Sequence, residues 1–161
     1  MESSGMEFAD IVGTLSRSAA RGDGSAVADL FSEQGQYHDV FYGTFTGRAA
    51  IRDMIENYFH RDAEDFIWDM HDPVSHGGIG YARYVFSYQS KLSGCEGRRG
   101  MFEGVAIIRL DSDGKITDYR EVAESGVGLS LLGFEDKRIA RFLSREAEAL
   151  KARPESAAHV K

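Results

Sequence analysis

Residues 36–51 read QYHDVFYGTFTGRAAI, and this stretch carries the clearest fold signal in the chain. Its first part, residues 36–41, is typical of a strand, and the Gly-bounded segment 42–47 predicts a turn or a short hairpin. Apolar side chains then recur at helical spacing, at Ala50, Ile51, Met54, Ile55, Tyr58 and Phe59. The stretch therefore predicts a strand that turns into an amphipathic helix.

The flanking sequence adds helices on one side and strands on the other. Before the stretch, residues 6–20 and 25–31 are expected to be helical. After it come four strand-like runs and a last helix, at residues 65–71, 79–92, 99–110, 115–123 and 135–152. Short turns between the runs favour antiparallel pairing. This order predicts one α+β domain over residues 6–152, with frayed ends at 1–5 and 153–161.

The composition fits one globular domain and limits its partners. A chain of 161 residues that is 42% hydrophobic and 28% charged can bury a core without disulfides. The net charge of −7 argues against nucleic acid, which requires an excess of Lys and Arg on one face. The longest apolar stretches, such as residues 104–108, are far short of the roughly 20 residues of a membrane-spanning helix. The single Cys95 and the absence of a secretory leader predict a cytoplasmic protein.

The order of elements resembles the nuclear transport factor 2-like superfamily. The resemblance lies in residues 37–41 running through 47–51 into a helix, and in residues 113–121 at the last strand, and it covers about residues 6–150. It implies a cone-shaped fold, with a curved antiparallel (mixed) sheet wrapped around N-terminal helices, a pocket inside and a C-terminal helix. The superfamily includes SnoaL-type polyketide cyclases, ketosteroid isomerase, limonene epoxide hydrolase and members without catalytic activity, so the fold alone does not decide the chemistry.

The closest likeness within the superfamily is to limonene epoxide hydrolase. Tyr37 and Asp39 stand ten and eight residues before Gly47, as a Tyr-x-Asn pair does in that enzyme. The resemblance implies that Arg83 is a bridging cation, that Glu121 is the general base, and that Tyr37 and Asp39 position a water. Val85 occupies the place of the carboxylate that protonates the epoxide oxygen. Asp39 is the alternative base, because it falls near the proton-shuttling Asp of ketosteroid isomerase.

Strand alternation supports a common site for these residues. Side chains two positions apart share a face, which pairs Tyr37 with Asp39, Arg83 with Val85, and Tyr119 with Glu121. If the three faces meet inside the cone, an acid, a cation and a phenol converge, and a carboxylate held there is a usable base. The alternative is a structural ion pair between Arg83 and Glu121.

A small apolar or aromatic molecule is the expected ligand. The residues predicted to contact it are Trp68, Met70, Val85, Met101 and Tyr119, although core packing explains such side chains equally well. No cofactor is expected, and the spacing of His38, His71 and His76 matches no metal site. The apolar segment 126–134 is expected to cap the cone or to pack on a second subunit, and Cys95 is interpreted as a loop cysteine.

Two functions remain open from the sequence. The first is a cofactor-free acid–base enzyme that hydrates, isomerises or cyclises an apolar substrate. The second is a ligand-binding or assembly module of the same fold without catalysis. In either case the resemblance implies a homodimer joined through the outer face of the sheet, and residues 105–108, which are apolar on both faces, favour such cover.

Overall fold

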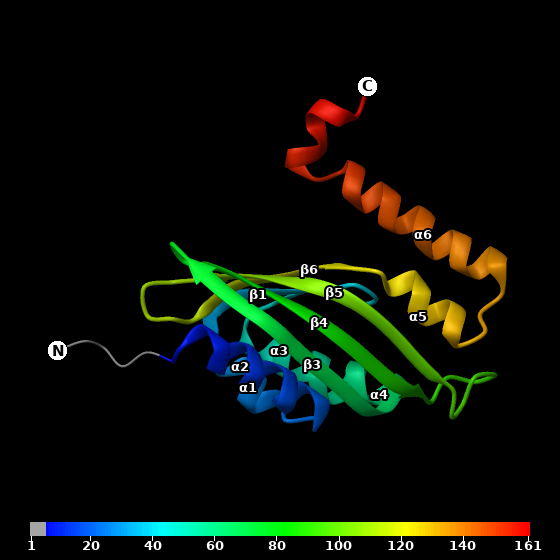
Figure 1. Cartoon of the computed structure of the whole chain (residues 1–161), viewed down its shortest axis with the longest axis horizontal. Coiled ribbons are helices and arrows are strands. Elements are labelled where there is room, and N and C mark those ends of the chain that lie inside the picture. The colour runs from blue at the N-terminus through cyan, green and yellow to red at the C-terminus, as the bar shows by residue number, and fades with distance from the viewer. Residues whose placement is uncertain (1–5) are drawn as a thin grey trace.

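The strands form one six-stranded sheet in the computed structural model, which describes residues 6–161 (Figure 1). The expected frayed end at residues 1–5 lies outside the described residues. In chain order the strands are β1 (Phe31–Asp39), β2 (Gly43–Thr46), β3 (Ala63–His76), β4 (Ile79–Ser90), β5 (Arg99–Leu110) and β6 (Ile116–Ala123). Their order in the sheet is β2-β1-β6-β5-β4-β3. The curved, open sheet with its helices confirms the predicted α+β class.

The sheet is mixed, because one of its pairings is parallel. Strands β3, β4, β5 and β6 follow one another as antiparallel neighbours, and β2 folds back on β1 through a turn at Gly43, whose φ is 91°. The parallel pair is β1 with β6, which places the first strand beside the last one. The connection from β5 to β6 is a tight turn in which Asp111 Oδ1 accepts the backbone N–H groups of Asp113 and Lys115 at 2.9 Å each.

The first helices cover one face of this sheet. They are α1 (Phe8–Ala20), α2 (Gly24–Ala28), α3 (Arg48–Asp53) and α4 (His60–Asp62), with a π-helix, Met54–Phe59, between the last two. Helix α1 packs on β3, and its Phe8 approaches Gly80 so closely that an added Cβ would lie 2.3 Å from the ring. Any larger residue at position 80 would force the ring of Phe8 to move. The π-helix ends at Phe59, a residue that reaches the interior described below, and such helical irregularities are frequent at functional sites.

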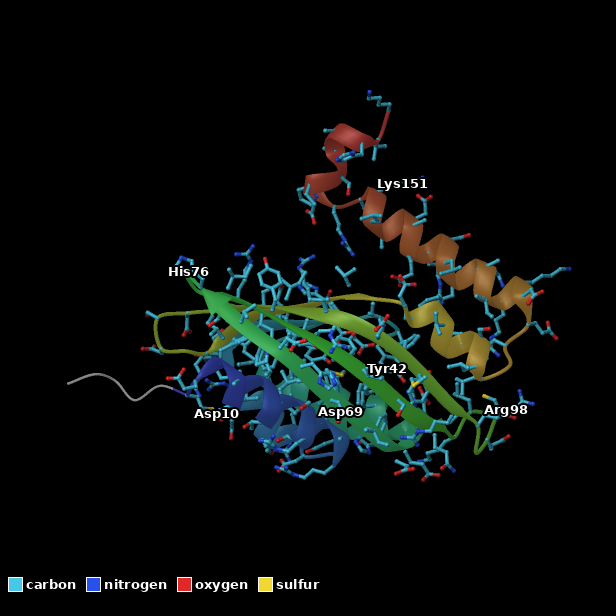
Figure 2. All side chains as sticks on the ribbon, in the orientation of Figure 1. Asp10, Tyr42, Asp69, His76, Arg98 and Lys151 are labelled. Atoms are coloured by element: carbon cyan, nitrogen blue, oxygen red, sulfur yellow. The ribbon has the colours of Figure 1, made fainter. Side chains whose placement is uncertain are left out.

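The chain after β6 differs from the expectation in two places. The apolar segment 126–134, for which no helix was predicted, overlaps the helix α5 (Ser125–Leu131). The end at 153–161, which we expected to be frayed, contains a 3₁₀-helix, Pro154–His159, with Ser156 buried. Between them, α6 (Asp136–Lys151) leads away from the sheet, so that Lys151 lies far from the strands (Figure 2).

The core lies between the sheet and the N-terminal helices, where side chains fill the space (Figure 2). Its largest fully buried side chains include three tyrosines, at positions 37, 84 and 119, each 1% exposed or less. A buried tyrosine hydroxyl needs a hydrogen-bond partner. The partners of these hydroxyls lead to the candidate site.

Candidate active site

The parallel pairing of β1 and β6 brings two carboxyl groups to the same place. Tyr37 lies opposite Tyr119 in the register, and their rings stack with centroids 4.5 Å apart. Asp39 and Glu121 follow two residues later on the two strands, so both project from the same face of neighbouring strands. Both line one small hollow on the concave face, which we call the inner hollow.

Glu121 is held by two tyrosine hydroxyls. Tyr84 Oη donates a hydrogen bond to Glu121 Oε2 at 2.7 Å, and Tyr119 Oη donates one to Oε1 at 2.6 Å. Tyr84 lies on β4, two residues after Ala82 and on the same face of the strand. Ala82 is paired with Ala106 of β5, and Ala106 is paired with Glu121 of β6, so Tyr84 reaches Glu121 diagonally across β5. The two buried hydroxyls are thereby satisfied, and both carboxyl oxygens have a donor.

Asp39 is fixed by the backbone that follows it. Its Oδ2 accepts the N–H groups of Phe41 at 2.8 Å and Tyr42 at 3.0 Å, as Asp commonly does at the start of a turn. These bonds set the orientation of the carboxyl group at the end of β1. The same turn sends Phe41 toward the interior, where it packs against the core.

Burial raises the pKa of both carboxyl groups. Loss of hydration raises the pKa of Asp39 from 3.8 to about 6, although the two backbone N–H donors oppose this effect. Loss of hydration also raises the pKa of Glu121 from 4.5 to about 7; the charge of Asp39 adds to this, and the hydroxyls of Tyr119 and Tyr84 oppose it. Both carboxyl groups therefore change protonation state closer to neutral pH than an exposed carboxyl group does.

The tyrosines beside the pair remain protonated. Burial raises the pKa of Tyr37, Tyr84 and Tyr119 well above the usual 10.0, and the charge of Glu121 adds to the rise in each case. The hydroxyls of Tyr84 and Tyr119 therefore act as neutral hydrogen-bond donors to Glu121 over the whole physiological pH range.

The inner hollow is small and contains an unused donor. Its volume is about 20 Å³, which is room for roughly one water or one ligand oxygen. Trp68 lines it, and the buried indole N–H of Trp68 has no hydrogen-bond partner within residues 6–161. Trp68 therefore brings an unpaired donor to the residues around the two carboxyl groups.

A larger aromatic cavity of about 230 Å³ adjoins the inner hollow, and we call it the outer cavity. The two spaces share Phe41, Phe59 and Phe86 in their walls. Leu129 of α5 and Leu132 and Phe134 after it close the outer cavity on one side, so the segment 126–134 caps the interior of this chain. A pocket with apolar walls and a few converging polar groups is the usual form of a small-molecule site.

The structure corrects the predicted position of Arg83. Arg83 lies opposite Val105, which lies opposite Val122, so it projects from the convex outer face and not toward Glu121. Its side chain is 51% exposed and pairs with Asp72 at 3.4 Å. The expected pair between Arg83 and Glu121 is therefore absent, because the two side chains point to opposite faces of the sheet.

Two of the predicted contact residues are misplaced for the same reason. Val85 shares the outer face with Arg83, and Met101 lies on that face opposite Ser87, with 48% exposure. Three others are inside: Trp68 lines the inner hollow, Tyr119 holds Glu121, and Met70 packs against the core beside Tyr84.

Sequence reasoning missed Tyr84 as a partner of Glu121. A signal was present in β4, where the even positions Ala82, Tyr84, Phe86 and Tyr88 are all apolar or aromatic and all buried. The odd positions carry Arg83 and are more polar. This contrast identifies the inner face of β4.

Within residues 6–161, no group of three or more His, Cys, Asp or Glu side chains lies close enough together to hold a metal ion. No helix in this range has the length and apolar character needed to cross a membrane.

Comparison with solved structures shows the same fold in several proteins. A protein with a ketosteroid isomerase-like fold from Catenulispora acidiphila, solved with trimethylamine, is 18% identical with a TM-score of 0.71, over 80% of this chain and 96% of that one. An epoxide hydrolase from M. tuberculosis that is similar to limonene epoxide hydrolase is 15% identical with a TM-score of 0.61, over 76% and 86%. IdmH, a proposed polyketide cyclase from Streptomyces antibioticus, is 16% identical with a TM-score of 0.64, over 80% and 100%.

The family follows from the sequence match. The model of the SnoaL-like domain matches residues 13–119, which is most of the chain. This chain therefore belongs to the SnoaL-like domain family, and the resemblance inferred from residues 37–51 and 113–121 is confirmed. No curated protein matches the chain.

Proposed function

We propose that this chain is a cofactor-free acid–base enzyme acting on a small apolar or aromatic substrate bound in the outer cavity. The observation that carries the proposal is the pair of carboxyl groups, with pKa values of about 6 and about 7, in a hollow that shares the walls Phe41, Phe59 and Phe86 with the aromatic outer cavity. Asp39 loses its proton at the lower pH and is the base, while Glu121 keeps its proton to higher pH and is the acid.

The inner hollow suits one oxygen of the substrate. For a ketone, the carboxylate of Asp39 takes a proton from the carbon beside the carbonyl, and the electrons of that C–H bond form the C=C bond of an enol. The carboxyl group of Glu121 gives its proton to the carbonyl oxygen, to which the free N–H of Trp68 also donates. Return of a proton at another carbon, or attack of the enol on a second carbonyl, completes an isomerisation or a cyclisation.

The same pair supports hydration. Asp39 would accept a proton from water as the water attacks one epoxide carbon, and Glu121 would protonate the epoxide oxygen as its bond to that carbon breaks, giving a diol. This supplies an acid that Val85, on the outer face, cannot. The epoxide hydrolase and the proposed polyketide cyclase with this fold support testing both substrate classes.

The pair predicts a bell-shaped pH dependence of kcat/KM. The rate is expected to rise through a pKa of about 6 as Asp39 ionises and to fall through about 7 as Glu121 loses its proton. Initial rates from pH 4.5 to 9 would test this on a substrate found by screening epoxides, enones and polyketide-like ketones. Asp39→Asn should remove the acidic limb from the residual rate, and Glu121→Gln the alkaline limb. A profile that is flat between pH 5 and 8 would contradict the proposal.

The alternative is a binding module that has kept the cavity and lost catalysis. One observation favours it: both oxygens of Glu121 already accept hydrogen bonds from tyrosines. Such a module would bind ligands from the same screen with no turnover of any of them.

We also propose that two copies pair through the outer face of the sheet. This face carries exposed apolar side chains on β3 to β6, at Ile67, Tyr81, Met101, Val105 and Val122, with charged residues such as Asp69 and Arg83 between them. Sedimentation at micromolar concentration is expected to give twice the 17.8 kDa of the chain. Val122→Lys should shift the protein to monomer, whereas Val127→Lys on α5, an exposed valine away from the sheet, should not. A monomer at all concentrations would rule out this pairing.

A further inference from the structure

Two arginines of α6 lie in the wall of the outer cavity. Arg138 and Arg145 are seven residues apart, which places them on one side of the helix two turns from each other. Phe142, between them, is the buried residue of α6 and packs on Phe41 with ring centroids 5.6 Å apart. The helix therefore presents an aromatic ring flanked by two guanidinium groups to the outer cavity.

Neither guanidinium has a carboxylate partner within residues 6–161. The Cζ of Arg138 lies 4.1 Å from the ring centroid of Phe134, and that of Arg145 lies 5.9 Å from the ring centroid of Phe142. The carboxylate in the same wall, Asp62, is already engaged by Arg61 at 2.8 Å and by the Tyr42 hydroxyl at 2.7 Å. The rim of the outer cavity thus carries two cations whose hydrogen-bonding capacity is not used by the protein.

We propose that Arg138 and Arg145 bind an anionic oxygen group, a carboxylate or a phosphate, on the ligand whose apolar part fills the outer cavity. This inference rests on the proposed function, in which the outer cavity is the ligand site. A guanidinium binds either group with two parallel N–H donors. Cation–π contacts with Phe134 and Phe142 place the two guanidinium groups beside the space that the ligand occupies.

The charges of the cavity also fix the direction of the ligand. Asp39 and Glu121 at the inner hollow would repel an anion, so the anionic end of a ligand belongs at the rim and the uncharged end faces the carboxyl pair. The chain carries a net charge of −7, so its surface as a whole does not attract anions. Local recognition by the two arginines is then the source of any preference for an anionic ligand.

Matched probes test the preference without any need for turnover. The probes are 2-naphthoate, its neutral isostere 2-naphthamide, and 2-naphthyl phosphate, with affinities measured by calorimetry. Methyl NMR signals of Leu92, Leu129 and Leu132, which line the outer cavity, report whether a probe binds there. At least one anionic probe is expected to bind about 10-fold or more tightly than the amide, as charge-assisted hydrogen bonds contribute. Which anion gains more separates a carboxylate ligand from a phosphate ligand.

Substitutions in α6 assign the preference to its residues. Arg138→Gln and Arg145→Gln are each expected to reduce the advantage of the anionic probes, and the double variant should abolish it while the amide binds as before. Arg141→Gln is the matched control, because Arg141 is an exposed arginine of the same helix that does not line the outer cavity. Its affinities should equal those of the wild type.

The outcomes separate this inference from the proposed function. Equal binding of the anionic probes and the amide, or an unchanged preference in the double variant, overturns the inference and leaves the acid–base proposal standing. Failure of all three probes to bind at millimolar concentration overturns the inference and the assignment of the outer cavity together. Full turnover after Asp39→Asn overturns the assigned base and does not affect the anion site.

Discussion

Asp39→Asn is expected to reduce kcat by about 10²–10⁴-fold, the range that general acid–base catalysis supplies. The substitution keeps the shape of the side chain, and the amide oxygen can still accept the N–H groups of Phe41 and Tyr42 that now bind Oδ2. What is lost is the ability to take a proton. Because the local turn is retained, KM should change much less than kcat.

The measurement requires steady-state rates with the best substrate from the screen. Asp69→Asn is the control, since Asp69 is an exposed carboxylate of β3 on the outer face, opposite Val85. Its kcat should match the wild type. If Asp39→Asn keeps full turnover while Glu121→Gln loses it, Glu121 is the base and the two roles assigned here are reversed.

The second large effect concerns stability. The free energy of unfolding is expected to decrease as pH rises from about 4 to about 7, by up to roughly 3 kcal/mol for each of the two carboxyl groups. The sign follows from the raised pKa values of Asp39 and Glu121. In this interval the folded protein keeps protons that the unfolded chain has released, so raising the pH favours unfolding. Above about pH 7 these two groups cause no further decrease in the free energy of unfolding.

Urea unfolding at pH 4.5 and pH 8 would measure this effect. From pH 4.5 to pH 8 the free energy of unfolding of the variant Asp39→Asn/Glu121→Gln should rise by several kcal/mol relative to that of the wild type. The reason is that the variant has no carboxyl group to ionise in the inner hollow. The comparison between pH values cancels any constant cost of the altered contacts with Tyr84 and Tyr119. Asp69→Asn again serves as control. An equal pH dependence in the double variant and the wild type would refute the raised pKa values.

The positions of most strands along the chain were predictable, because they depend on local sequence patterns. The predicted run 99–110 coincides with β5, and 79–92 differs from β4 only at its end. The helix α5 was missed because its sequence, SGVGLSL, has glycines that weaken helical propensity. The helix is stabilised by its apolar side chains in the wall of the outer cavity, and these are tertiary contacts. Propensity alone cannot report such contacts.

Alternation along a strand determined from sequence alone that Tyr37 lies with Asp39, and Tyr119 with Glu121, because successive side chains point to opposite faces. The sequence of a single strand did not indicate which of its two faces lies in the interior. A choice that is wrong by one residue exchanges the two faces, and this placed Arg83, Val85 and Met101 inside when they lie outside. Only the tertiary structure decided that β1 runs parallel to β6. That long-range pairing, which joins the first strand to the last, sets Asp39 beside Glu121 in a desolvated hollow and gives both their raised pKa values.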